Sequence, residues 1–97
     1  MAEIVYSPNA IANIEHAFEH LAEKDPRSAL AAASAIGTAI DILARHPLIG
    51  RPVEGELREL VISFGRTGYV ALYRFVPSEN RVRVLAIRHQ RELDYPD

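Results

Sequence analysis

The chain has 97 residues, of which 48% are apolar and 25% are charged, and its formal net charge is −2 at pH 7. This length allows a single domain over residues 1–97 and excludes a separate cofactor-binding unit, so we expect no cofactor. The sequence has no cysteine, which excludes disulfide scaffolds and thiolate zinc sites. It shows no secretory signal and no apolar run near the ~20 residues of a membrane span. We therefore expect a cytoplasmic protein that does not enter a membrane.

The N-terminal half predicts a short strand, at residues 3–6, followed by a helical hairpin. Ser7-Pro8 and Asp25-Pro26 each combine a capping side chain with a proline suited to the first helical turn. These signals predict helices over about residues 8–23 and 26–46. The apolar residues that recur at helical spacing, and that we expect to face the core, are Ile11, Ile14, Phe18 and Leu21 in the first helix and Leu30, Ala33, Ile36, Ile40 and Leu43 in the second.

Gly37 lies inside the second predicted helix, where glycine lowers helix stability by up to about 1 kcal/mol. We expect close packing of another backbone against this position to offset that loss. The helix is predicted to end at His46, because Pro47 disfavours the α conformation in the residue before it.

The C-terminal half predicts three antiparallel strands joined by short turns. Runs of β-branched and aromatic residues span 57–64, 69–76 and 81–88, and turn residues separate them. Residues 47–56 contain two prolines and two glycines, and we expect an ordered loop there. The predicted fold class is α+β, with a short N-terminal strand, an α-helical hairpin and a three-stranded antiparallel meander.

Charge is distributed unevenly along the chain. Residues 57–91 contain seven arginines and two acids, whereas residues 1–48 contain three basic residues and six acids. We therefore expect an acidic helical half and a basic sheet, and we expect the sheet to meet a partner.

A basic cluster at the end of the third predicted strand is the main candidate for that surface. If the last two strands pair across the turn at residues 77–80, Arg88 lies opposite about Tyr69. The residues that then gather at this end of the meander, with no acid among them, are Arg66, Arg88, His89 and Arg91. A solvated basic edge is the structural alternative for residues 88–91.

Arg58 and Arg74 fall at the other end of the meander and are the second choice for the target-binding surface. An ion pair with a nearby glutamate, at position 54, 56 or 59, is the structural alternative for either arginine. Tyr69 and Tyr73 alternate with smaller residues along one strand, and we expect them to pack in the core rather than to stack on bases.

Residues 16–20 match the pattern H-x-x-E-H, in which two histidines one helical turn apart hold zinc. Position 20 lies about 200° around the helix from Phe18, so we expect His20 to face solvent. The short chain also leaves little room for a third ligand and a substrate cleft. We therefore predict no metal site.

The order of these elements resembles the RelE/ParE superfamily of toxins from bacterial type II toxin–antitoxin modules. Residues 46–52 resemble the loop that follows the hairpin in this family, and residues 57–61, 68–74 and 84–92 resemble its later strands. The resemblance implies a toxin whose expression arrests growth. It also implies a cognate antitoxin partner, whose acidic, amphipathic tail would cover the hairpin and the sheet.

The family contains two activities: ParE-like members act on DNA gyrase, and RelE-like members cleave mRNA on the ribosome. The ribonuclease needs basic groups that the resemblance places near Leu60 and Ile62 and at Val70, where none is basic. Its terminal arginine falls on His89 and its tyrosine on Tyr95, which would be the catalytic residues of a ribonuclease. The chain looks more like ParE, which implies a non-enzymatic gyrase inhibitor. A ribosome-dependent endoribonuclease and an inactive interaction module remain as alternatives.

Overall fold

The computed structural model describes residues 1–92 and 94–96. The elements in chain order are β1 (Glu3–Tyr6), α1 (Pro8–Ala22), α2 (Pro26–Asp41), the 3-10 helix η1 (Ile42–Ala44), β2 (Arg51–Glu54), β3 (Leu57–Phe64), β4 (Thr67–Val76), the 3-10 helix η2 (Pro77–Glu79) and β5 (Arg81–His89). The predicted α+β class is confirmed, with its N-terminal strand, helical hairpin and meander.

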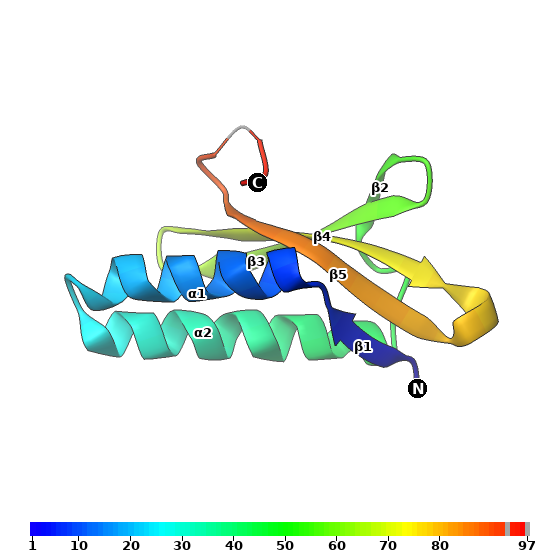
Figure 1. The fold of residues 1–97 in the computed structure, drawn as a ribbon, viewed down its shortest axis with the longest axis horizontal. Helices are drawn as coiled ribbons and strands as arrows, with labels where there is room; N and C mark the ends of the chain where they lie inside the picture. The colour runs from blue at the N-terminus through cyan, green and yellow to red at the C-terminus, as the bar shows by residue number, and fades with distance from the viewer. Residues whose placement is uncertain (93, 97) are drawn as a thin grey trace.

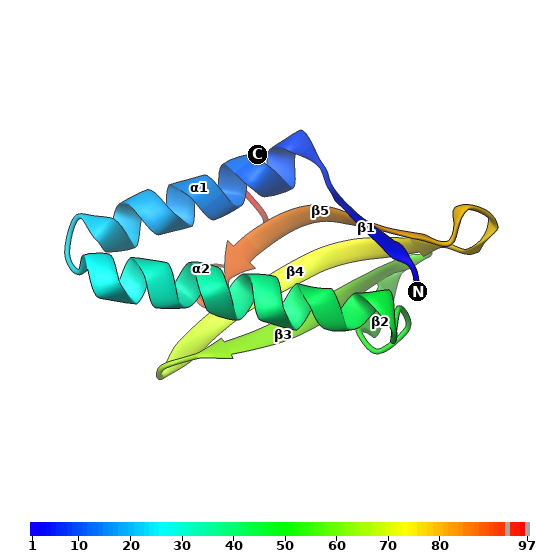
Figure 2. The same cartoon turned by 90° about the horizontal axis from the view of Figure 1, so that it is seen from below.

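The strands form one five-stranded sheet in the order β1-β5-β4-β3-β2. β1 pairs with β5 in parallel, and the other neighbours are antiparallel. The two helices lie side by side on one face of the sheet (Figures 1 and 2), and the C-terminal segment lies on the opposite face (Figure 1). We call these the helix face and the outer face.

Strand β2 was not predicted, because residues 47–56 were expected to form a loop. Arg51 and Pro52 pair with Glu59 and Arg58, and a register shift follows before Glu54. Pro52 is tolerated because β2 is the edge strand of the sheet, and within the described part of the chain no further strand needs a backbone N–H from its free edge.

The helices begin as predicted, with the Ser7 hydroxyl accepting the N–H of Ala10 at 3.0 Å and Asp25 accepting that of Arg27 at 3.1 Å. Their buried faces differ from the prediction, however, since Ile11 is 46% and Leu30 64% exposed. Many of the buried helix residues are small. The buried positions are Ala10 and Asn13 in α1 and Ala29, Ala32, Ile36 and Ile40 in α2.

The expected close packing at Gly37 is wrong, because a Cβ built there would have no atom within 4 Å. Residues Pro26–Ala44, with a mean hydropathy of 1.3, are long and apolar enough by composition to cross a membrane. In the structure this segment packs on the sheet through Ile36 and Ile40. Core helices of other proteins have the same composition, so the segment alone does not show a membrane protein.

A β-bulge in β5 decides which residues face the helices. Leu72 pairs with Ala86 and Tyr73 with Val84, so Leu85 is an extra residue on β5. The side chains of β5, which alternate between the two faces of the sheet, therefore switch faces at the bulge. The β5 side chains buried on the helix face are Val82, Val84 and Ile87.

Helix α1 holds this bulge in place. The Asn13 side-chain oxygen accepts the N–H of Ile87 at 2.9 Å, and the Ser7 hydroxyl donates to the Leu85 carbonyl at 2.9 Å. As a result His89, not Arg88, lies opposite Tyr69. The predicted pairing is wrong by one residue, which moves Arg88 to the outer face.

Candidate functional site

A cavity of about 640 Å³ lies between the second half of α1, the β3–β4 turn and the end of β5. We call it the sheet-end cavity. The basic residues and histidines that line it are His16, His20, Arg66, His89 and Arg91, and the acid in the lining is Glu92. The other lining residues are Ala17, Leu21, Phe64, Gly65, Thr67 and Tyr69. Three of the four residues that the sequence grouped together, Arg66, His89 and Arg91, thus share one cavity.

His89 is held in a fixed orientation inside this cavity. Its Nδ1 accepts the backbone N–H of Arg91 at 3.2 Å, and its Nε2 lies 2.8 Å from the Thr67 hydroxyl. Because Nδ1 is an acceptor, a neutral ring carries its proton on Nε2 and donates it to Thr67. The ring also meets Tyr69 edge-on, with centroids 5.5 Å apart. Both ring nitrogens are therefore engaged.

His16 and His20 were not predicted to join this surface. His20 is exposed, as expected, but both histidines line the cavity from α1. Their spacing of four residues places them on one side of the helix, which was the available signal. Within residues 1–92 and 94–96, no three His, Cys, Asp or Glu side chains are grouped so that they could hold a metal ion.

Arg88 does not belong to the cavity and is not free of acids, contrary to the prediction. Its guanidinium is on the outer face, where Nη2 lies 3.8 Å from the Glu59 carboxylate. Nη1 donates to the carbonyl of Glu92 at 2.8 Å and makes longer bonds to those of His89 and Gln90. The side chain is only 14% exposed. Arg88 therefore ties the C-terminal segment to the sheet.

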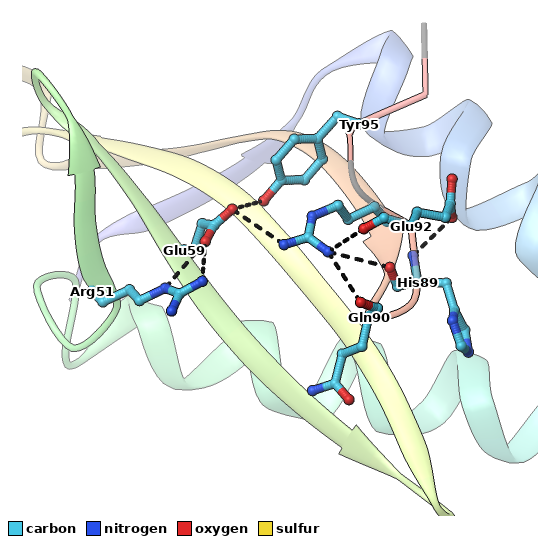
Figure 3. A network of polar contacts seen from close by, with 7 residues as sticks. Arg51, Glu59, His89, Gln90, Glu92 and Tyr95 are labelled. Atoms are coloured by element: carbon cyan, nitrogen blue, oxygen red, sulfur yellow. Dashed lines mark hydrogen bonds and ion pairs between the residues drawn. The ribbon is translucent and has the colours of Figure 1, made fainter.

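Glu59 is the centre of this outer-face network (Figure 3). One carboxylate oxygen accepts two hydrogen bonds from Arg51, at 3.1 and 2.7 Å, and the other accepts the Tyr95 hydroxyl at 2.6 Å. Burial acts to raise the pKa of Glu59, but the hydrogen bonds from Tyr95 and Arg51 and the charges of Arg51 and Arg88 outweigh it and lower the pKa. Glu59 is therefore a buried, charged carboxylate that is fully partnered.

Tyr95 closes the network from the C-terminal segment. Its ring lies under the Arg88 guanidinium, 5.2 Å from the Arg88 Cζ, in a cation–π contact. Burial raises the pKa of the Tyr95 phenol, and the hydrogen bond to Glu59 raises it further. The hydroxyl therefore stays protonated and directed at Glu59.

The second-choice residues Arg58 and Arg74 lie near each other along the strands but on opposite faces of the sheet. Arg74 pairs with Leu57 across the strands and only approaches Glu56, at 3.8 Å between Nε and Oε2. Arg58 makes no ion pair with any residue that the structure describes. It donates instead to the carbonyls of Leu48 and Gly50, at 3.0 and 2.8 Å.

The fold and this geometry can be compared with known proteins. The sequence profile of the ParE toxin of type II toxin-antitoxin system, parDE, matches residues 4–94. The chain belongs to this family. A ParE-family toxin is the toxin component of a type II toxin–antitoxin system, and this membership supports an antitoxin partner. The resemblance to the RelE/ParE superfamily is confirmed.

Relatives from Caulobacter vibrioides carry RelE names. This ParE-family toxin is 39% identical to Toxin RelE1 over 72 residues, which are 74% of this chain and 75% of that protein. It is 33% identical to Toxin RelE3 over 92 residues, covering 95% of this chain and 98% of that one. A structure of the chromosomal ParDE TA system from P. aeruginosa superposes with a TM-score of 0.77 at 22% identity, covering 92% of this chain and 96% of that one, and shows the shared fold.

Proposed function

We propose that this ParE-family toxin inhibits DNA gyrase without catalytic chemistry of its own, and that a cognate antitoxin neutralises it in the cytoplasm. The observation that carries the proposal is the partnered state of the outer face. A ribonuclease of this fold needs a free tyrosine, with a free cation beside it, to orient and stabilise the reacting phosphate. The Tyr95 hydroxyl is instead bound to Glu59, and the cation that contacts its ring, Arg88, is bound to backbone carbonyls and lies near Glu59.

The sheet-end cavity is the surface that we assign to the target. Arg66 and Arg91 are exposed there, and neither makes an ion pair within the described part of the chain. His89 lines the same cavity and is held by the Thr67 hydroxyl and by the backbone N–H of Arg91. Two unpaired guanidinium groups beside an apolar lining suit a partner surface that carries phosphates or carboxylates.

A gyrase assay tests this proposal. Purified toxin is added to gyrase, ATP and plasmid DNA, and covalent gyrase–DNA complexes are trapped and counted. We expect these complexes to accumulate with toxin concentration, and we expect growth arrest when the toxin is expressed without its antitoxin. Unchanged supercoiling and unchanged cleavage at excess toxin would rule out gyrase as the target. Normal growth after induction would favour an inactive interaction module.

A ribosome-dependent endoribonuclease is the second candidate, and the placement of His89 favours it. His89 lines the same cavity as Arg66 and Arg91, and an imidazole in a site with two guanidinium groups has the chemistry for proton transfer next to a phosphate. Primer extension on translated mRNA decides between the two functions. Cleavage with codon periodicity that disappears in His89→Ala would establish the ribonuclease, and intact message would exclude it.

A further inference from the structure

The loop that follows η1, residues 46–50, holds two large apolar side chains in solvent. Leu48 and Ile49 are each 58% exposed. The loop is anchored by Tyr73, whose side chain is fully buried. The Tyr73 hydroxyl donates to the Pro47 carbonyl at 2.8 Å and accepts the N–H of Gly50 at 2.8 Å.

Two further features fix the shape of the 46–50 loop. Gly50 is required by close approach, because a Cβ there would lie 2.6 Å from the Tyr73 hydroxyl and 2.8 Å from the Glu59 carbonyl oxygen. Arg58 Nη1 donates to both the Leu48 and the Gly50 carbonyls. The loop is therefore preorganised, and a partner that binds it loses little entropy in ordering it.

The exposed side chains border two adjoining hollows on the helix face. One, of about 400 Å³, is lined by His46, Pro47, Leu48, Ile49 and Phe75. The other, of about 280 Å³, shares Leu48 and Phe75 and brings in Arg58. Glu56 also lines the second hollow, and its closest cation is Arg74 rather than Arg58. An apolar groove thus meets a half-buried arginine that carries no carboxylate partner among the described residues.

We propose that the 46–50 loop is a docking site for a segment of the antitoxin that presents one large apolar side chain and, beside it, a carboxylate. The apolar side chain fills the hollow between Leu48 and Phe75, and the carboxylate meets Arg58. Rigid apolar anchors at a pocket are the usual centres of binding energy at interfaces. This inference rests on the proposed antitoxin partnership and assigns it a place on the fold.

The surroundings of the loop favour this occupant over two others. A second copy of the chain would make a two-fold contact that places the same patch face to face, which brings two unpaired Arg58 side chains together. The gyrase-facing surface proposed above lies at the other end of β4, beside Thr67 and Tyr69 rather than Phe75.

Binding of the full-length toxin to the purified product of the adjacent antitoxin gene tests the inference by isothermal titration. We expect the double variant Leu48→Ser/Ile49→Ser to bind at least tenfold more weakly than wild type. Leu30→Ser is the control, because Leu30 is 64% exposed but lies on α2, outside both hollows, so a tail that only covers the hairpin would lose affinity there instead. Its affinity should stay within threefold. Both variants should keep the wild-type melting temperature and still arrest growth. Arg58→Gln should remove most of the salt dependence of binding.

Each other outcome overturns the inference in a recognisable way. Wild-type affinity in the Leu48→Ser/Ile49→Ser variant, or an equal loss in Leu30→Ser, means that the loop is not the anchor. Loss of growth arrest with antitoxin binding intact means that the loop meets the target. A toxin dimer that the variant dissolves means that a second copy occupies it, and unchanged salt dependence in Arg58→Gln excludes the carboxylate. No binding by wild-type toxin refutes the antitoxin partnership itself.

Discussion

Replacing Tyr73 with Phe tests how the fold holds the 46–50 loop. The ring is fully buried, and Phe fills the same space apart from the hydroxyl. The change leaves the Pro47 carbonyl without its donor and the Gly50 N–H without its acceptor. A buried polar group left unsatisfied costs about 1–3 kcal/mol. The bond to Gly50 is buried and the bond to Pro47 only partly so, and we therefore expect the free energy of unfolding to fall by about 2–4 kcal/mol. Urea denaturation at pH 7 measures this loss.

Tyr69→Phe is the matched control. Tyr69 is buried on the same face of β4, but its hydroxyl makes no hydrogen bond to a residue that the structure describes. We expect its stability to change by less than about 0.5 kcal/mol. Hydrogen exchange at the Gly50 amide should accelerate only in Tyr73→Phe. Equal losses in the two variants would refute this account of the loop.

Three further predictions concern stability. Asn13→Ala removes the acceptor of the buried Ile87 N–H and should lower the free energy of unfolding by about 1–3 kcal/mol in urea, whereas Asn9→Ala should change it by less than half as much. Gly37→Ala should raise the melting temperature and add up to about 1 kcal/mol, because a methyl group there meets no neighbour within 4 Å. The pKa of Glu59 is lowered in the folded protein, so the charged carboxylate stabilises the fold. This contribution to the free energy of unfolding is complete above the unfolded-state pKa of about 4.3 and is lost as the pH falls through the folded-state pKa. The stability difference between wild type and Glu59→Gln should therefore be largest near neutral pH and shrink in acid, and a difference independent of pH would contradict this.

Local signals in the sequence predicted most of the fold. Ser7 and Asp25 mark the helix starts by chemistry that acts within one turn, and the meander follows from strand runs and turns. The bulge at Leu85 is different, because residues 81–88 alternate regularly in sequence. It depends on hydrogen bonds from Ser7 and Asn13, more than seventy positions away, which no local pattern records. That single insertion sends Arg88 to the outer face.

The candidate site was predicted only in part, for the same reason. Arg66, His89 and Arg91 were brought together by the turn geometry, which is local to the meander. His16 and His20 join them only through the packing of α1 on β5. The role of Glu59 was missed because its partners Arg51 and Tyr95 lie 8 and 36 positions away, and a buried carboxylate looks like any other glutamate in a sequence.

The central claim is that the sheet-end cavity meets gyrase, and trapped gyrase–DNA complexes measure it most directly. The variant Arg66→Ala/Arg91→Ala changes two exposed cavity residues, and Arg45→Ala/Arg74→Ala removes the same charge elsewhere on the surface. Both variants should have a free energy of unfolding within about 1 kcal/mol of the wild-type value. The account predicts at least a tenfold loss of trapped complexes in the cavity variant and wild-type levels in the control. Wild-type trapping by the cavity variant, or an equal loss in the control, would contradict it.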